Sequence, residues 1–215
     1  MVISQVKTKA MVINFTRSYQ FNTRLKLKNE NIEIVNKMKI LGTTITDTLS
    51  WDDNCQEIIS KVNTRMLLLQ GTYAFGATKK EMVHLWIIYC RSVLEQSAVL
   101  WSSSLSQQNI EDLERTQKSF VKLICPNNKD YEQTLLKLNL QTLEQRRKYL
   151  CLKFAKDNIK IDKLKDLFPE NTKPNKMKTR YQEAYEVLHA NTNRLKNSSI
   201  INMQHLLNDD HKNTK

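Results

Sequence analysis

Glycine and proline are scarce in this chain, with three of each among 215 residues. This scarcity argues against an all-β fold and against a loop-rich fold, because both need many turn residues. The chain also lacks a long apolar run, since no stretch approaches the roughly 20 residues that cross a membrane. We therefore expect a mainly helical protein without a membrane-spanning segment.

The four cysteines are Cys55, Cys90, Cys125 and Cys151, and no two of them have the short spacing of zinc ligands. No histidine completes a cluster with them, so the sequence predicts no metal site. Each cysteine lies in or beside an apolar helical pattern, where a thiol acts as a small hydrophobic side chain. The N-terminus carries no secretory signal pattern. We expect reduced thiols and an intracellular protein, in the nucleus or the cytoplasm.

Positive charge is abundant and unevenly distributed. The formal net charge is +12, from 34 Lys and Arg against 22 Asp and Glu. Residues 1–50 carry 8 basic against 3 acidic side chains, and residues 115–180 carry 17 against 7, whereas residues 51–114 carry 5 against 8. Two basic segments around an acidic one are typical of proteins that bind polyanions, because Lys and Arg must cluster to displace counterions from phosphates. A soluble protein that is merely basic is the alternative.

Short apolar alternations over residues 6–46 predict three or four short antiparallel strands. The first strand ends in the apolar run Met11–Ile13. A hairpin follows, with its turn around Asn29. Residues 38–46 are expected to form one further strand, in which Gly42 marks a bulge or a close approach of the backbone.

The helical period takes over after Asp47. A helix is predicted over residues 52–70, with Asp52–Asp53 at its start. Carboxylates there cap free amides and complement the helix dipole, so we favour this structural role over a metal site. Two capping boxes, Thr78-x-x-Glu81 and Thr142-x-x-Gln145, are expected to open later helices.

The apolar spacing also predicts which side of each later helix is buried. Ser106 is expected to cap a helix in which Glu114 and Lys118 form an outward ion pair. The inward side chains predicted for the helix after Thr78 include Tyr89 and Leu100, and those for the helix after Thr142 are Leu143, Leu150 and Phe154. The predicted fold class is thus α+β, mostly α.

Several segments of the chain resemble the end of the reverse transcriptase of non-LTR (LINE-type) retrotransposons. They are KTKAMVINF (Lys7–Phe15), KMKILGTTITDTLSW (Lys37–Trp51), RSVLEQSAVLW (Arg91–Trp101), LERTQKSFVKLI (Leu113–Ile124) and HANTNRLKNSSIINMQHLLN (His189–Asn208). The resemblance implies an antiparallel palm remnant with the primer grip at 1–50, a helical thumb bundle at 51–126 and a basic helical extension at 127–168. A linker and a loosely attached C-terminal tail occupy 169–215.

The resemblance also implies roles for individual residues. In this family the lysines of the KTK segment lie near the phosphates of the incoming nucleotide. The resemblance assigns this role to Lys7 and Lys9. Lys39, Leu41 and Gly42 correspond to the primer grip. There a glycine permits close approach of the backbone to the primer, while Leu41 anchors the hairpin. Solvated lysines and an ordinary strand end with a bulge are the structural alternatives.

Two further groups of basic residues are candidates for contact with a nucleic-acid backbone. Arg115, Lys118 and Lys122 recur on one side of a predicted helix, and a solvated helix face explains them equally well. The second group is the tightest basic cluster of the chain, Arg146, Arg147 and Lys148.

The sequence predicts no catalytic residue, because in this family the metal-binding aspartates precede the KTK segment. The intact enzyme would use two Mg²⁺ ions, for which this chain provides no site. We therefore expect a C-terminal fragment of an RNA-directed DNA polymerase that grips a hybrid of RNA template and DNA primer, with its N-terminal polymerase segments missing and no activity alone. The alternatives are a stand-alone basic helical nucleic-acid-binding protein and a non-functional remnant of a decayed mobile element.

Overall fold

A computed structural model describes residues 4, 8–15, 24–27, 30–171 and 183–214. The chain divides into two compact units, residues 1–57 (unit 1) and residues 58–215 (unit 2). The structure is 59% helix and 10% strand, which confirms a mostly helical α+β protein. Among the described residues, no helix has both the length and the apolar character that a membrane crossing needs.

The first strands of unit 1 are only two residues long. β1 (Lys9–Ala10) pairs in parallel with β4 (Glu33–Ile34), and β2 (Lys26–Leu27) pairs antiparallel with β3 (Glu30–Asn31). The hairpin expected here is present as β2–β3, but the expectation of purely antiparallel strands is wrong. Most side chains of these strands are exposed, so little apolar burial favours longer pairing.

The last two strands of unit 1 form a tight hairpin. β5 (Lys37–Ile40) and β6 (Thr43–Thr46) are antiparallel, with Ile40 opposite Thr43. The connection is the two residues Leu41 and Gly42, with φ of 48° and 86°. Positive φ at both central residues is the geometry of a type I′ hairpin turn. The prediction of one strand interrupted by a bulge at Gly42 is therefore wrong, because Gly42 completes a turn.

Helix α1 (Asp52–Ala74) begins in unit 1 and continues in unit 2. Asp52 and Asp53 lie in its first turn, as predicted. The apolar spacing predicts one buried face that comprises Ile58, Ile59, Val62, Met66 and Leu69. All of these side chains are buried except Ile59, which is half-buried. The helix extends four residues past its predicted end at residue 70, and Gly76, with φ of 96°, follows it in a conformation that favours glycine.

The segment after α1 is helical but irregular. It comprises α2 (Lys79–Leu85), a π-helical turn η1 (Trp86–Arg91), α3 (Ser92–Leu94), α4 (Ala98–Trp101) and a 3₁₀ turn η2 (Ser102–Ser104). Tyr89 and Leu100 are 40% and 51% exposed, so their predicted burial is wrong. The π turn shifts the helical phase, and Ser97 interrupts the helix at φ of 53°, which explains both errors.

The centre of unit 2 is built around α5 (Gln107–Ile124), which Ser106 caps as predicted. Phe120 of α5 stacks on Trp86, with ring centroids 4.6 Å apart. Gln117 is fully buried, and its amide nitrogen donates to Tyr131 Oη (3.0 Å) and to the Gln141 carbonyl (2.9 Å). These bonds connect α5 to α6 (Tyr131–Lys137) and to the chain that precedes α7 (Leu143–Ile159).

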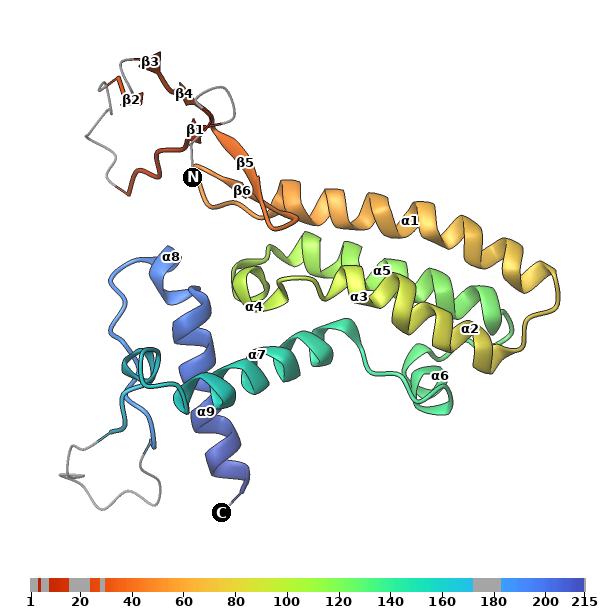
Figure 1. Ribbon diagram of the computed structural model, residues 1–215. Coiled ribbons are helices and arrows are strands. Elements are labelled where there is room, and N and C mark those ends of the chain that lie inside the picture. Colours follow the sequence, from red (N-terminus) through yellow and green to blue (C-terminus); the bar gives the residue numbers. More distant parts are fainter. Residues whose placement is uncertain (1–3, 5–7, 16–23, 28–29, 172–182, 215) are drawn as a thin grey trace. The chain divides into compact units, whose positions relative to one another are not determined.

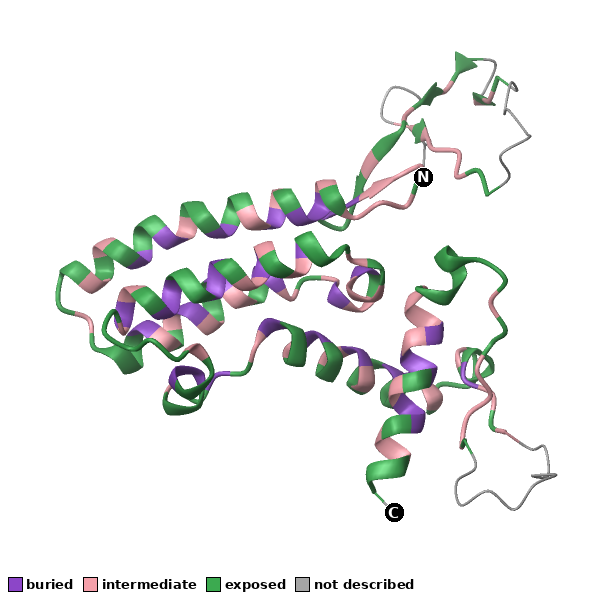
Figure 2. Ribbon diagram, turned by 180° about the vertical axis from the view of Figure 1, so that it is seen from behind, coloured by how far each residue is buried: buried purple, intermediate pink, exposed green. Residues whose placement is uncertain are grey.

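The C-terminal part of unit 2 has its own apolar cluster. This part of the chain comprises η3 (Lys165–Leu167), α8 (Asn193–Lys196) and α9 (Ser199–Asn213). Helix α9 crosses α7 in both views (Figures 1 and 2). The clustered side chains are Cys151, Ala155, Phe168, Met203 and Leu207. The tail that the sequence suggested to be loosely attached thus contributes α9 to a packed core.

Helix α7 buries a different side from the one predicted (Figure 2). Its buried residues are Leu143, Arg147, Cys151, Ala155 and Asn158, whereas Phe154 is 42% exposed. Because the predicted face was Leu143, Leu150 and Phe154, only Leu143 is confirmed as buried.

Candidate nucleic-acid interface

Among the residues of unit 1 that the structure describes, the tip of the β5–β6 hairpin carries the most exposed large apolar side chain. Leu41 is 94% exposed at φ of 48°, so its predicted role as an anchor of the hairpin is wrong. A left-handed backbone conformation costs a non-glycine residue roughly 1 kcal/mol, and Asn or Gly would fit this turn better. The side chain of Leu41 is therefore presented to solvent from a strained backbone conformation.

The part of the hairpin next to the turn is held on the first turns of α1. Thr43 and Thr44 are buried. The Thr44 amide donates to Asn54 Oδ1 (3.1 Å), and the Thr44 hydroxyl donates to Glu57 Oε1 (2.8 Å). All of these residues belong to unit 1. The hairpin is therefore supported up to its turn, where Leu41 and the backbone of Gly42 are presented outward.

Two lysines of β5 lie on the outside of the hairpin and pair with α1. Lys37 Nζ is 2.8 Å from Asp53 Oδ2, and Lys39 Nζ is 2.6 Å from Glu57 Oε2. The hydrogen bond and the charge of Asp53 raise the pKa of Lys37. Exposed ion pairs of this kind contribute little free energy, so a phosphate can replace either carboxylate at small cost.

The KTK segment is only partly described. Lys9 is exposed in β1, and its Nζ lies 3.1 Å from Glu33 Oε2. Lys7 lies outside the described residues. The predicted contact of these lysines with a nucleotide stays a prediction.

Helix α5 presents the predicted basic face of unit 2. Arg115, Lys118 and Lys122 are all exposed, and their spacing of three and four residues places them on one side of the helix. Arg115 pairs with Asp112 at 2.6 Å, and Lys118 lies over the ring of Tyr131 at 5.4 Å. The face is positive and accessible, as a phosphate contact requires.

The outward ion pair predicted between Glu114 and Lys118 is absent. Instead, Glu114 accepts hydrogen bonds from Tyr131 Oη (2.5 Å) and from the Leu143 amide (3.0 Å). It thereby satisfies a free amide at the start of α7 and connects three helices. Burial, together with the bond to Glu114, raises the pKa of Tyr131 above its usual value.

The basic cluster predicted on α7 is not one surface. Arg147 is only 4% exposed, so its predicted contact with a nucleic acid is wrong. Arg146 donates from Nε and Nη2 to the two carboxylate oxygens of Glu95, at 2.9 and 3.0 Å. Lys148 is exposed and pairs with Glu144 at 2.7 Å. Consecutive helical residues point about 100° apart, so three adjacent cations cannot share one face.

The carboxylate of Glu95 also pairs with Arg91, at 3.3 Å between Nε and Oε1. The three side chains are mostly buried, with 16–20% of their surface exposed. Because Arg146 donates to both carboxylate oxygens of Glu95, its guanidinium is held in place by a bidentate ion pair. We therefore interpret Arg146 as a structural residue. Of the three predicted cations on α7, only Lys148 remains accessible.

Metal-binding and thiol chemistry have little support in the described part of the chain. No group of three or more His, Cys, Asp or Glu side chains is placed there to hold a metal ion. Cys55, Cys90 and Cys151 are buried free thiols, and Cys125 is half-buried.

No protein-family model matches the chain, and no curated protein or solved structure shows significant similarity to it.

One feature of unit 2 was not predicted from the sequence. Four large apolar side chains on the segment from α1 to η1 are exposed: Leu67, Leu68, Phe75 and Ile88. The available signal was the run Leu67–Leu69, three consecutive leucines on a helix that buries only one side.

Proposed function

We propose that this chain is the C-terminal part of a LINE-type reverse transcriptase and that it grips the hybrid of RNA template and DNA primer. In this proposal unit 1 carries the end of the palm and the primer grip, and unit 2 carries the thumb, the basic extension and the tail. The aspartates that hold the catalytic Mg²⁺ ions belong to polymerase segments outside this chain.

The observation that carries the proposal is the Leu41–Gly42 tip. A supported hairpin that ends in a strained, exposed leucine and a glycine is costly for the fold alone. Strain of this kind is concentrated at functional sites. A glycine lets phosphates approach the backbone closely, and a leucine at the tip provides apolar contact with a sugar or a base.

The distribution of accessible cations supports a partner that is recognised through its backbone. Lys37 and Lys39 lie on β5 in unit 1, and Arg115, Lys118 and Lys122 follow α5 in unit 2. Regularly spaced cations of this type contact phosphates and carry no sequence information. We therefore expect binding without sequence preference.

A stand-alone nucleic-acid-binding protein is the second candidate, favoured by the separate core of unit 2. The two functions differ in how they treat a primer end. A primer grip prefers a hybrid with a recessed DNA 3′ end, whereas a general binding protein binds a blunt duplex of equal length as well.

The experiment that tests the proposal replaces Leu41 by Asn and measures binding of a fluorescent RNA template annealed to a shorter DNA primer. Asn suits the left-handed conformation, so Leu41→Asn keeps the hairpin folded and stabilises it by about 0.5–1 kcal/mol. We expect about tenfold weaker binding, because the apolar contact of one leucine is lost.

Leu136→Gln is the matched control, since Leu136 is 79% exposed on α6 and belongs to no part of the proposed site. This variant should bind like the wild type. Unchanged affinity of Leu41→Asn, or equal affinity for recessed and blunt ends, would contradict the primer-grip assignment.

A further inference from the structure

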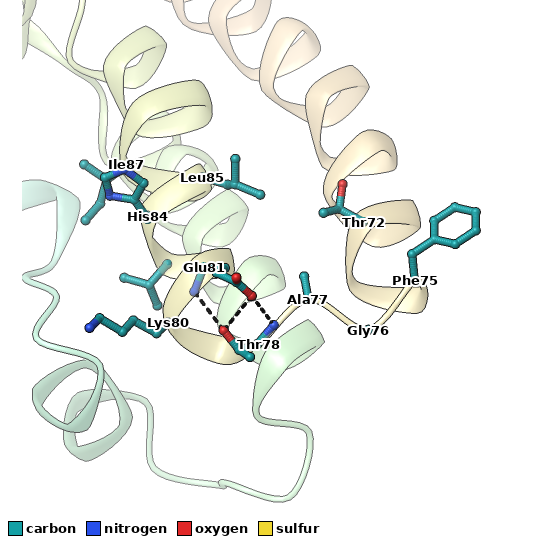
Figure 3. A pocket seen from close by; sticks show the side chains of 11 residues that line it. Thr72, Phe75, Gly76, Ala77, Thr78, Lys80, Glu81, His84, Leu85 and Ile87 are labelled. Carbon is teal, nitrogen blue, oxygen red and sulfur yellow. Dashed lines mark hydrogen bonds between the residues drawn. The ribbon is translucent and has the colours of Figure 1, made fainter.

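The turn between α1 and α2 contains an open groove that the nucleic-acid function does not use. It has a volume of about 1080 Å³ and is lined chiefly by aliphatic and small side chains. Figure 3 shows Thr72 at the end of α1 and Leu85 on α2 on opposite sides of the gap, with Phe75 at the outer edge. We call this feature the α1–α2 groove, lined by Thr72, Phe75, Ala77, Val83, Leu85 and Ile87 among others.

The groove continues into an exposed apolar strip on α1. Leu68, Thr72 and Phe75 are spaced by four and three residues, so they lie on one side of the helix. Leu68 is 60% exposed and Phe75 is 95% exposed. Burial of such side chains is the main source of affinity when a helix docks in a groove.

Basic side chains outnumber acidic ones in the chain segment that forms the groove. From Ile58 to Leu94 the chain has five Lys and Arg residues and a single acidic residue, Glu81. Glu81 is occupied by its capping box, because its Oε2 accepts from the Thr78 amide (2.8 Å) and from the Thr78 hydroxyl (2.7 Å). Lys79 and Lys80 remain exposed in the first turn of α2, at the end of the groove.

We propose that the α1–α2 groove is a docking site for an acidic amphipathic helix of another protein. The apolar side of that helix would cover Leu68 and Phe75, and its carboxylates would meet Lys79 and Lys80. Positive charge beside an apolar groove is complementary to this partner.

Other polyanionic partners fit the groove less well. Single-stranded nucleic acid is held by successive aromatic side chains, whereas the rings among the residues that line the groove are Phe75 and His84, on different elements. A membrane surface accepts a projecting apolar helix face, whereas this site is concave.

The turn between α1 and α2 is preorganised, because the capping box of Thr78 and Glu81 fixes the start of α2.

The test uses the whole chain and a synthetic peptide of about 20 residues, with Leu at positions i, i+3, i+4 and i+7 and Glu at the exposed positions. A peptide of the same composition with scrambled order has no apolar face and serves as the control ligand. Binding is measured by fluorescence anisotropy at low and moderate salt. We expect the amphipathic peptide to bind and the scrambled peptide to bind at least about tenfold more weakly.

Two variants locate the site. The double variant Leu68→Gln/Phe75→Gln removes the apolar contacts, and Lys79→Glu/Lys80→Glu reverses the charge. Each should weaken peptide binding about tenfold or more, whereas Leu136→Gln, at a leucine on α6 that is 79% exposed, should not. All substituted residues are exposed, so circular dichroism should show a folded chain in each case.

Three results would overturn the proposal. Equal binding of the scrambled peptide would remove the requirement for an apolar face. Equal loss in Leu136→Gln would place the peptide elsewhere. Displacement of the peptide by a single-stranded oligonucleotide or by anionic phospholipid vesicles, which also lose affinity in the groove variants, would assign the groove to that ligand instead.

Discussion

Arg146 and Arg147 are adjacent in the sequence and have different surroundings in the fold. Arg147 lies in the buried face of α7, and Arg146 is bound to Glu95. Lys122 on α5 is exposed, at the position where the spacing placed a phosphate contact. Adjacent basic residues in the sequence therefore did not form one surface on α7, whereas the helical spacing correctly predicted an exposed basic side of α5. Its contact with phosphates stays a prediction.

The contrast between Arg147 and Lys122 can be measured directly. Arg147→Met removes a buried cation at similar volume, and we expect it to lower the free energy of unfolding by about 1–3 kcal/mol without changing the salt dependence of hybrid binding. Lys122→Gln should change stability by less than about 0.5 kcal/mol and reduce the salt slope by about one. Urea denaturation and anisotropy titrations check both; a reduced slope in Arg147→Met would contradict its structural role.

The four cysteines should also differ in reactivity, according to their burial. Burial raises the pKa of Cys90 to about 11 and also raises the pKa of Cys151. At pH 8 the reactive thiolate of either residue is therefore rarer than in an exposed cysteine. We expect a thiol reagent to modify half-buried Cys125 first, as followed by mass spectrometry of the native protein. Faster modification of Cys90 than of Cys125 would show that the core around Cys90 opens readily.

At the scale of helices, sequence signals for the ends proved more reliable than signals for the faces. Ser106, Thr78 and Thr142 cap helices as predicted, because a cap depends only on residues three positions away. The buried face of α7 depends on α4, α5 and α9, which are distant in the sequence. The π turn η1 shifts the phase of the second helix and has no signal in the sequence that we could identify.

The cap of α7 gives a prediction at this scale. The Thr142 side chain accepts from the Gln145 amide at 3.1 Å, and Gln145 Oε1 accepts from the Thr142 amide at 3.1 Å. Thr142→Ala removes the first bond and should lower the free energy of unfolding by about 1 kcal/mol. Thr142→Ser keeps the hydroxyl and should restore most of the loss. Thermal and urea denaturation of both variants are the measurements; equal destabilisation by Ser would exclude the cap as the cause.

For the whole molecule, composition predicted the fold class well and the strands poorly. Scarce glycine and proline and regular helical spacing indicated a mostly helical protein, which the structure confirms. The parallel pair β1–β4 was not predicted, because its strands are more than 20 residues apart and no local pattern records such a pairing. For residues 38–46 the apolar alternation predicted one interrupted strand, where the structure has the hairpin β5–β6. Of the predicted site residues, the exposed cations of α5, Lys148, Lys9 and Lys39 and the Leu41–Gly42 tip remain candidates.

The proposed function makes a further expectation for the whole chain. Because the resembling family holds its catalytic ions upstream of the KTK segment, purified chain should extend no primer in the presence of Mg²⁺ and deoxynucleotides. A primer-extension gel with an active reverse transcriptase as positive control checks this. Template-dependent incorporation would contradict the assignment of the catalytic aspartates to segments outside this chain.

The salt dependence of hybrid binding tests the central claim most directly. If the chain neutralises about four phosphates of an RNA–DNA hybrid, the logarithm of affinity plotted against the logarithm of salt concentration should have a slope of about −3 to −4. Anisotropy titrations of wild-type protein across a range of salt concentrations give this slope. A slope shallower than about −1, or no binding at low salt, would contradict the claim that this protein grips a nucleic-acid duplex.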